Sequence, residues 1–196
     1  MTSTKKSFFG RNGIVILSFV AFIALGLPDG LLGVGWPSIR ATFGIPLDSM
    51  GLLLFSATVG YLTAAFLNGK LISRFGVGKV LAASCALTGL TLIGYSVSPS
   101  WYLMSALGLT AGLGAGAIDA GLNTFVAANF NEGLMQWLHG SYGIGVTFSP
   151  LIMSFAVNSL NSWRLGYDIV GVFQIVLALC FVISLPLWKT EKKAGE

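Results

Sequence analysis

Two aspartates lie inside long apolar stretches of the sequence and are its strongest candidates for chemistry. Asp29 lies within the stretch Ile14–Pro37, and Asp119 lies within Trp101–Ala128. A carboxylate at the middle of a bilayer costs at least ~2.5–3.5 kcal/mol, so such a residue rarely stays there without a role. At 1.5 Å per residue, Asp29 and Asp119 lie roughly 22 Å and 14 Å from the helix ends on the side of the N-terminus. We therefore expect both carboxyl groups deep in the hydrocarbon.

The residues around both aspartates at helical spacing are small or polar. They are Gly26, Gly30 and Gly33 for Asp29, and Ala115, Gly116 and Asn123 for Asp119. Small neighbours favour packing against a cavity or another helix over exposure to lipid. No Lys or Arg is expected at this depth, which leaves a neutral carboxyl, a water-filled cavity or a partner elsewhere. Desolvation favours the protonated form, and such a group can bind and release a proton as access to the site alternates.

Three further polar residues belong to the candidate site, and each also has a purely structural explanation. His139, the only histidine, is expected near the depth of Asn123 and is either a proton or solute relay or a packed polar residue. Tyr142 and Asn123 suit a sugar, although they suit many other polar solutes. Gln174 is expected to form an interhelical hydrogen bond, which is also the structural alternative for the two aspartates. The predicted solute- and proton-binding set is Asp29, Asp119, Asn123, His139 and Tyr142.

The composition is that of a membrane protein. Of the 196 residues, 55% are hydrophobic and only 9% are charged, against roughly 25% charged residues in soluble proteins. The mean hydropathy is +0.82, and the 26 glycines indicate membrane helices that pack closely through small residues. These values exclude most soluble enzymes, nucleic-acid binders and disulfide-framed secreted modules. Because no phosphate loop, metal-binding cluster or nucleophile–base pair is present, we predict no enzymatic activity, no cofactor and no metal.

Six apolar stretches predict an all-α membrane protein with six transmembrane helices. Each stretch is long enough to cross the hydrocarbon, and turn-forming residues separate them. The expected spans are Ile14–Pro37, Leu47–Leu67, Gly78–Val97, Trp101–Ala128, Leu134–Val157 and Gly166–Trp188. The corresponding division of the chain is an N-terminal tail over residues 1–13, a six-helix bundle over residues 14–188 and a basic tail over residues 189–196.

The positive charges predict the orientation of this bundle in the membrane. If the N-terminus is cytoplasmic, that side collects most of the Lys and Arg residues, which is a strong positive-inside bias. They are Lys5, Lys6, Arg11, Lys70, Arg74, Lys79, Lys189, Lys192 and Lys193, against Arg40 and Arg164 outside. The tryptophans near the expected helix ends are typical of an interfacial belt. We expect both termini in the cytoplasm and the bundle in the inner (cytoplasmic) cell membrane, with the lipid bilayer and not nucleic acid as a partner.

A weak internal repeat relates the two halves of the bundle. A shift of 90 residues superimposes the Gly and the Asp of Gly26–Asp29 on those of Gly116–Asp119, and it places Arg74–Gly76 on Arg164–Gly166. Arg74–Gly76 and Arg164–Gly166 are each expected just before the third helix of their triplet. Because three helices are an odd number, the second triplet must be inverted relative to the first. Such inverted repeats are typical of secondary transporters, whose binding sites lie near the midplane between the repeats.

The segment after the second apolar stretch resembles a signature of the major facilitator superfamily. Residues 69–81 are similar to the superfamily pattern Gly-x-Leu-x-Asp-Arg-x-Gly-x-x-x-x-Leu between helices 2 and 3, with Ser73 in place of the Asp. The resemblance implies that this segment forms part of the inward gate. The matching residues that we assign to this gating motif are Gly69, Leu71, Arg74 and Gly76.

The stretches Gly112–Ala128 and Gln136–Gly145 resemble sugar permeases of the fucose–proton symporter type. This resemblance implies that Asp119 takes part in proton coupling and that Asp29 falls near a carboxylate that binds sugar. Gly108 occupies the place of the superfamily's helix-4 arginine, and the antiporter signature of helix 5 is present only in part. Both departures weaken an interpretation as a drug–proton antiporter.

The resemblance covers essentially the whole chain but only six of the superfamily's usual twelve helices. It implies half of a major facilitator fold, built as a 3+3 inverted repeat. We therefore expect a half-size or split secondary active transporter that moves a small polar solute, such as a sugar, with proton coupling and alternating access. A homodimer or a separately encoded chain would supply the second six-helix half. The alternative is a non-transporting fragment or membrane interaction subunit, and drug efflux is a weaker alternative.

Overall fold

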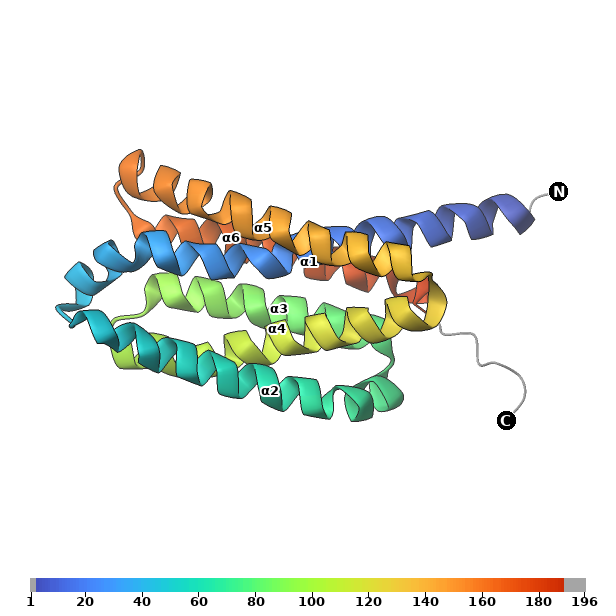
Figure 1. Cartoon of the computed structure of the whole chain (residues 1–196), viewed down its shortest axis with the longest axis horizontal. Coiled ribbons are helices and arrows are strands. Elements are labelled where there is room, and N and C mark those ends of the chain that lie inside the picture. Colours follow the sequence, from blue (N-terminus) through green and yellow to red (C-terminus); the bar gives the residue numbers. More distant parts are fainter. Residues whose placement is uncertain (1–2, 189–196) are drawn as a thin grey trace.

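Six long α-helices, joined by short connections, make up the protein (Figure 1). The computed structural model describes residues 3–188, with side chains for residue 10 and residues 12–188. The helices are α1 (Ser3–Phe43), α2 (Met50–Phe75), α3 (Val77–Val97), α4 (Trp101–Asn129), α5 (Glu132–Asn158) and α6 (Trp163–Ser184). Within the described range there is no strand, and all six helices are long and apolar enough to cross a membrane. The predicted all-α fold with six transmembrane helices is confirmed.

Helix α1 extends beyond the predicted span at both ends. It begins at Ser3, and its membrane-capable part runs over Asn12–Phe43, so most of the expected N-terminal tail has a helical backbone. Gly44 follows α1 with a φ of +64°, a left-handed conformation that glycine adopts at little cost and that commonly ends a helix. The expected tail over residues 189–196, with Lys189, Lys192 and Lys193, lies outside the described residues.

Local sequence explains where the other helices begin. The side chain of Ser100 accepts a hydrogen bond from the Leu103 backbone N–H at 3.3 Å at the start of α4. Asn131 caps α5 in the same way through the Leu134 N–H at 3.0 Å. Gly76 alone separates α2 from α3, and its φ of +83° lies in the left-handed region that favours glycine. The predicted gating motif therefore contains a glycine that this sharp turn requires.

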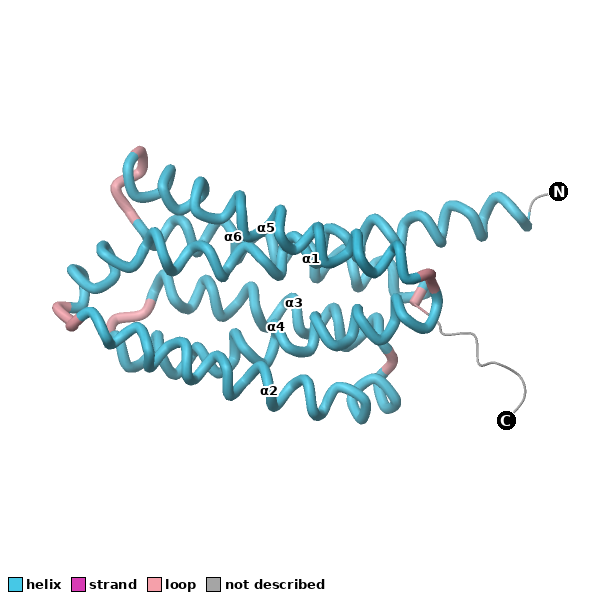
Figure 2. The backbone as a smooth tube through the Cα atoms, viewed as in Figure 1, coloured by secondary structure: helices cyan, strands magenta, loops and turns pink. Residues whose placement is uncertain are grey.

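Successive helices alternate in direction, so the joints collect at two ends of the bundle (Figure 2). The start of α1, the α2–α3 joint, the α4–α5 joint and the end of α6 share one end (Figure 1). The basic residues Lys70, Arg74 and Lys79 belong to that end, whereas Arg40 and Arg164 belong to the opposite end. This arrangement keeps apart the charges on which the predicted orientation rests. The side chains of Lys5, Lys6 and Arg11 lie outside the described ones.

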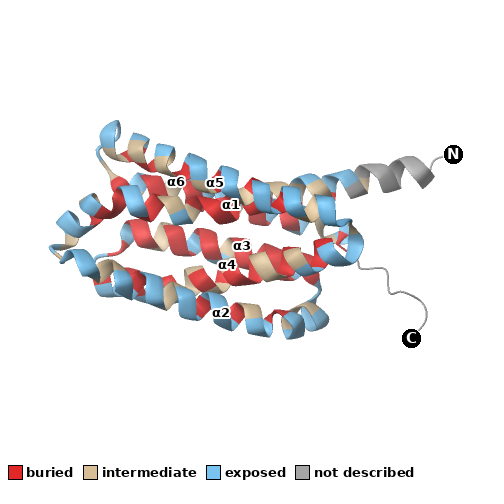
Figure 3. Ribbon diagram, in the orientation of Figure 1, coloured by how far each residue is buried: buried red, intermediate tan, exposed pale blue. Residues whose placement is uncertain are grey.

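The packing of the helices confirms the inverted repeat. Helix α1 packs along α5, α2 packs along α4, and α3 packs along α6. Exchanging α1 with α4, α2 with α5 and α3 with α6 leaves this set of pairs unchanged, as a twofold relation between two inverted triplets requires. Figure 3 shows that buried residues line the sides on which the helices face one another. The bundle is thus built from two inverted triplets of helices, as expected.

The 90-residue shift holds for the first helix of each triplet. A Cβ atom added to Gly26 would collide with the carbonyl oxygen of Tyr142, and one added to Gly116 would collide with the carbonyl oxygen of Tyr61. The two glycines therefore occupy equivalent places at the α1–α5 and α2–α4 crossings, where they let the backbones approach closely. Their tyrosine partners, however, are only 81 positions apart in the sequence.

The shift does not extend to the third helix of each triplet, and the predicted match of Arg74–Gly76 with Arg164–Gly166 is wrong. Arg74 lies in the last turn of α2, whereas Arg164 lies in the first turn of α6. Gly89 of α3 and Gly171 of α6 instead face each other across the crossing of these helices, 82 positions apart. The joints differ in length between the triplets, so no single shift aligns all three helix pairs.

Four of the five tryptophans are buried in the protein and do not form a lipid-facing belt. Trp36, Trp101 and Trp163 are at most 5% exposed, and Trp36 packs on Trp101 with ring centroids 5.2 Å apart. Trp188 packs against aromatic side chains at the other end of the bundle. Only Trp137 has an exposed ring. The position of these residues near helix ends was predicted, but their contacts are with neighbouring helices because the aromatic rings close the ends of the core.

Candidate functional site

The two predicted aspartates each bind a tyrosine of a neighbouring helix. Tyr61 Oη of α2 donates a hydrogen bond to Asp119 Oδ2 of α4 at 2.5 Å. Tyr142 Oη of α5 donates in the same way to Asp29 Oδ2 of α1. Because α1 corresponds to α4 and α2 corresponds to α5 in the inverted repeat, the two Tyr–Asp pairs are symmetry equivalents.

The local sequence places both pairs by the same means. In α1 and in α4 a glycine precedes the aspartate by three residues, which is about one helical turn. The backbone of each tyrosine rests against that glycine, Tyr142 against Gly26 and Tyr61 against Gly116. The phenol then reaches the carboxyl group one turn along the partner helix. A larger residue at either glycine would push the helices apart and separate the hydroxyl from the carboxyl.

Asp119 is held by a second side chain. Asn123 Nδ2, one turn further along α4, donates a hydrogen bond to Asp119 Oδ1 at 3.0 Å. Both carboxyl oxygens of Asp119 therefore have a donor, while Asp29 has one through Tyr142. In the described part of the chain, hydrogen bonds and not ion pairs satisfy the two carboxyl groups. The structure brings Asp29, Asp119, Asn123 and Tyr142 of the predicted set together in two pairs.

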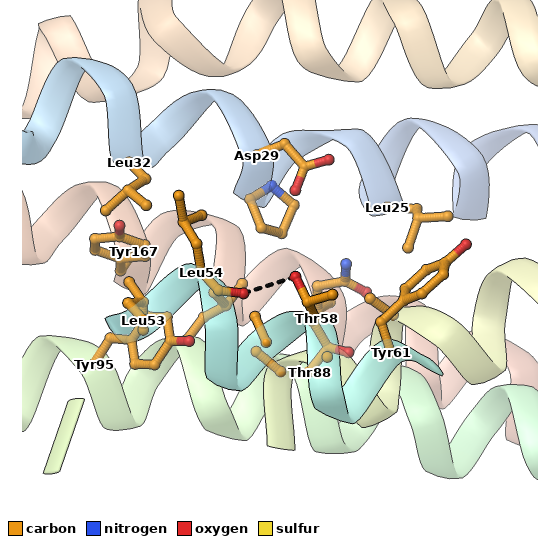
Figure 4. Close-up of a pocket in the computed structure, with 17 residues that line it drawn as sticks. Leu25, Asp29, Leu32, Leu53, Leu54, Thr58, Tyr61, Thr88, Tyr95 and Tyr167 are labelled. Atoms are coloured by element: carbon orange, nitrogen blue, oxygen red, sulfur yellow. Dashed lines mark hydrogen bonds between the residues drawn. The ribbon is translucent and has the colours of Figure 1, made fainter. Parts of the chain in front are cut away.

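A cavity of about 410 Å³ opens beside Asp29 and Tyr61 (Figure 4). In the close-up, Asp29 extends from α1 on one side of the cavity and Tyr61 extends from α2 on the other. The volume lies within the range of about 300–1,000 Å³ that small-molecule sites occupy. Five helices form the walls, in which leucine and alanine are the commonest apolar residues. The polar residues that line it are Asp29, Thr58, Tyr61, Thr88, Tyr95, Tyr167 and Gln174.

Of the predicted binding set, Asp29 alone lines this cavity. Asp119 does not line the cavity, but it accepts a hydrogen bond from Tyr61, whose ring is part of the cavity wall. His139 is exposed and packs edge-to-face on Phe22 of α1, with ring centroids 5.6 Å apart. This aromatic contact is what the structural alternative for His139 requires. A role of His139 as a relay stays a prediction.

Gln174 forms the interhelical hydrogen bond that the sequence predicted. Its Nε2 atom donates to the Ala24 carbonyl oxygen at 2.9 Å, which joins α6 to α1. The side chain is 1% exposed and also contributes to the inner wall of the cavity. The cavity therefore extends into the bundle as far as α6.

The residues of the gating motif lie at the end of the bundle that holds the α2–α3 joint. Leu71 is half-buried against the small cluster of Ala64, Val80 and Ala117, whereas Gly69 faces open space. The Arg74 guanidinium is exposed and stacks over the ring of its neighbour Phe75, 5.4 Å from the centroid. Ser73 Oγ donates to the Lys70 carbonyl oxygen at 3.0 Å. The motif thus combines a half-buried leucine and a glycine turn with an exposed guanidinium.

Two polar contacts of the bundle could not be predicted from the sequence. Tyr61 was not among the candidates, because nothing on its own helix marks it and its partner Asp119 is 58 residues away. Asp168 was also not selected, although it accepts a hydrogen bond from Ser96 Oγ where α6 meets α3. Arg164 donates to the carbonyl oxygens of Ser96 and Ser98 at the same place. Only the pairing of helices reveals these contacts.

Comparison with known proteins agrees with this geometry. The model of the Major Facilitator Superfamily matches residues 14–196. The glucose/mannose transporter GlcP of Bacillus subtilis is 23% identical over 176 residues, which are 89% of this chain and 44% of that protein. The 4-hydroxybenzoate transporter PcaK of Pseudomonas aeruginosa is 27% identical over 177 residues, 88% of this chain and 39% of that protein.

A solved structure shares the fold. The crystal structure of D-xylose-proton symporter superposes with a TM-score of 0.67 at 15% sequence identity, covering 94% of this chain and 49% of that one. The chain thus spans less than half the length of each of these proteins. The six helices, their inverted repeat and the family match over almost the whole sequence lead to one conclusion: the chain belongs to the major facilitator superfamily.

Proposed function

We propose that this chain forms half of a secondary active transporter that moves a small polar solute, such as a sugar, together with a proton. The observation that carries the proposal is the symmetric pair of Tyr–Asp hydrogen bonds beside a small-molecule cavity. A carboxyl group in a membrane helix that is held by neutral donors can be protonated without breaking an ion pair. Asp119 binds the proton in this proposal, and Asp29, which lines the cavity, binds the solute.

A second six-helix unit completes the transporter in this proposal. The support is that Asp29 and Tyr61 are exposed on the isolated bundle, while the relatives have more than twice the matched length. Exposed carboxyl and phenol groups at this depth would be costly against lipid, so a protein surface or water must cover them. Alternating access then follows from rocking of the two units around the site.

The proposed orientation places both termini in the cytoplasm of a cell whose inner membrane holds the bundle. The end that carries Lys70, Arg74 and Lys79 faces the cytoplasm, as the positive-inside rule requires. The gating motif of Gly69, Leu71, Arg74 and Gly76 then lies at the cytoplasmic mouth.

Uptake by proteoliposomes tests the proposal. The full chain is reconstituted, alone and with a candidate second half, and uptake of radiolabelled D-glucose, D-xylose and 4-hydroxybenzoate is measured with and without an inward proton gradient. We expect gradient-driven uptake of at least one of these solutes, and its loss in Asp119→Asn. Asp48→Asn, in the exposed turn before α2, is the matched control and should transport normally. Unchanged uptake in Asp119→Asn would remove this residue from the mechanism.

A second candidate function is that of a membrane interaction subunit that does not transport. The supporting observation is again that the matched region is less than half of each relative. A stable monomer that transports none of the three solutes, alone or beside candidate partners, would favour this function. Drug efflux is the weaker alternative, and extrusion of a fluorescent dye from intact cells addresses it.

A further inference from the structure

Tyr61 connects the carboxyl group of Asp119 to the cavity. We infer that Tyr61 is a hydrogen-bond relay, which transmits the protonation state of Asp119 to a hydroxyl-bearing solute in the cavity. The inference rests on the proposed function, because it assigns a coupling residue to the same site. It goes beyond that function by naming the group through which proton and solute influence each other.

The geometry separates the two ends of this relay. Asp119 is half-buried and does not line the cavity, while the Tyr61 ring does and is 37% exposed. Asn123 fixes one oxygen of Asp119 at 3.0 Å, which leaves the other for the Tyr61 hydroxyl at 2.5 Å. A change at Asp119 therefore reaches the cavity through the phenol of Tyr61.

The chemistry of a phenol makes this contact a switch. A phenolic hydroxyl has one hydrogen to donate and two lone pairs to accept with, whereas an ionised carboxylate can only accept. When Asp119 is ionised, Tyr61 must donate to it and offers only lone pairs to the cavity. When Asp119 is protonated, it can donate to Tyr61 and free the phenolic hydrogen for the solute. Protonation thus exchanges an acceptor for a donor at the cavity wall.

The surroundings of Asp119 contain few competing groups. Asp29 of α1 and Tyr142 of α5 are within electrostatic reach of the Tyr61–Asp119 pair, but they bond to each other. From α3, Ser84 and Thr88 face α4 at Gly114, and neither side chain titrates. Tyr142 does not line the cavity, so the symmetric pair does not provide a second relay.

Infrared difference spectroscopy between low and high pH tests the relay without any solute. The full chain in lipid nanodiscs is compared with Tyr61→Phe, Asp119→Asn and the control Tyr102→Phe, whose ring on α4 is 79% exposed. Tyr61→Phe keeps the ring in the cavity wall and removes only the hydroxyl. We expect a tyrosine C–OH band that changes together with a carboxyl band. The part of the tyrosine change that belongs to Tyr61 should be lost in Tyr61→Phe and Asp119→Asn and kept in Tyr102→Phe, while the Tyr142–Asp29 pair retains its own contribution in all variants. A tyrosine change in Tyr61→Phe that equals the wild-type change would overturn the inference.

The affinity for D-xylose, measured across the same pH range, tests whether the relay affects solute binding. We expect the affinity of the wild-type chain to change with pH by about fivefold, the equivalent of one hydrogen bond. The profile should be flat in Tyr61→Phe, and the double variant with Asp119→Asn should match the single variants, as groups in one chain of hydrogen bonds require. A flat profile in Asp119→Asn beside a wild-type profile in Tyr61→Phe would refute the relay but leave the proposed proton site standing. A wild-type profile and carboxyl band in Asp119→Asn would refute both. If D-xylose does not bind, the infrared result decides alone.

Discussion

Substitution of Gly112 by alanine should separate α2 from α4 and weaken the Tyr61–Asp119 contact. A Cβ atom at Gly112 would collide with the Ala57 carbonyl oxygen and would lie 2.8 Å from the Tyr61 backbone nitrogen. Carbon contacts are favourable at about 3.5–4.0 Å, so the helices must move apart by roughly 1 Å. The same movement would stretch the Tyr61–Asp119 hydrogen bond from 2.5 Å to the limit of a useful one.

In Gly112→Ala, two effects lower the free energy of unfolding and one effect raises it. Overpacking of a close helix contact costs about 1–3 kcal/mol, and the weakened hydrogen bond adds about 1 kcal/mol. Replacing glycine by alanine inside a helix returns about 1 kcal/mol. The net loss of about 1–3 kcal/mol should lower the Tm by roughly 3–10 °C for a chain of this length.

Thermal unfolding in detergent, followed by circular dichroism, measures this loss. Gly143→Ala is the matched control, because Gly143 lies inside α5 and a Cβ atom there meets nothing within 4 Å. Gly143→Ala should be as stable as the wild type or slightly more stable. If Gly112→Ala unfolds at the same temperature as Gly143→Ala, the close backbone contact between α2 and α4 does not determine their spacing.

Three further substitutions test other parts of the fold by the same unfolding measurement. Gly76→Val should cost about 1–3 kcal/mol because φ is +83° at the α2–α3 joint, and a stability equal to Gly69→Ala would contradict this strain. Gln174→Leu should cost about 1–3 kcal/mol by leaving a buried carbonyl of α1 without its donor, and no loss would show that the bond is dispensable. Trp163→Ala should cost about 3–5 kcal/mol, whereas Trp137→Ala, at an exposed ring, should change stability by less than about 0.5 kcal/mol. Similar losses in both variants would contradict the assignment of Trp163 to the protein core and favour a place in an interfacial belt.

Part of the candidate site could be predicted because a carboxyl group in the hydrocarbon of a membrane is costly whatever its neighbours in the fold are. Asp29 and Asp119 were identified from their apolar surroundings alone, and the structure places both in hydrogen-bonded pairs. Tyr61 could not be found in this way, since a tyrosine in a membrane helix is inexpensive and common. Its importance depends on Asp119, which belongs to another helix.

The sequence by itself determined the number of helices, their alternating direction and the two carboxyl groups within membrane helices. These properties depend on hydropathy, charge and spacing along the chain, because each segment interacts with the bilayer through its own residues. The tertiary structure decided which helices pair, the tyrosine that each aspartate receives and the cavity that only Asp29 of the predicted set lines. Helix pairing depends on close contacts at glycines such as Gly26 and Gly116, and the periodicity of a single helix does not contain the partner that meets it.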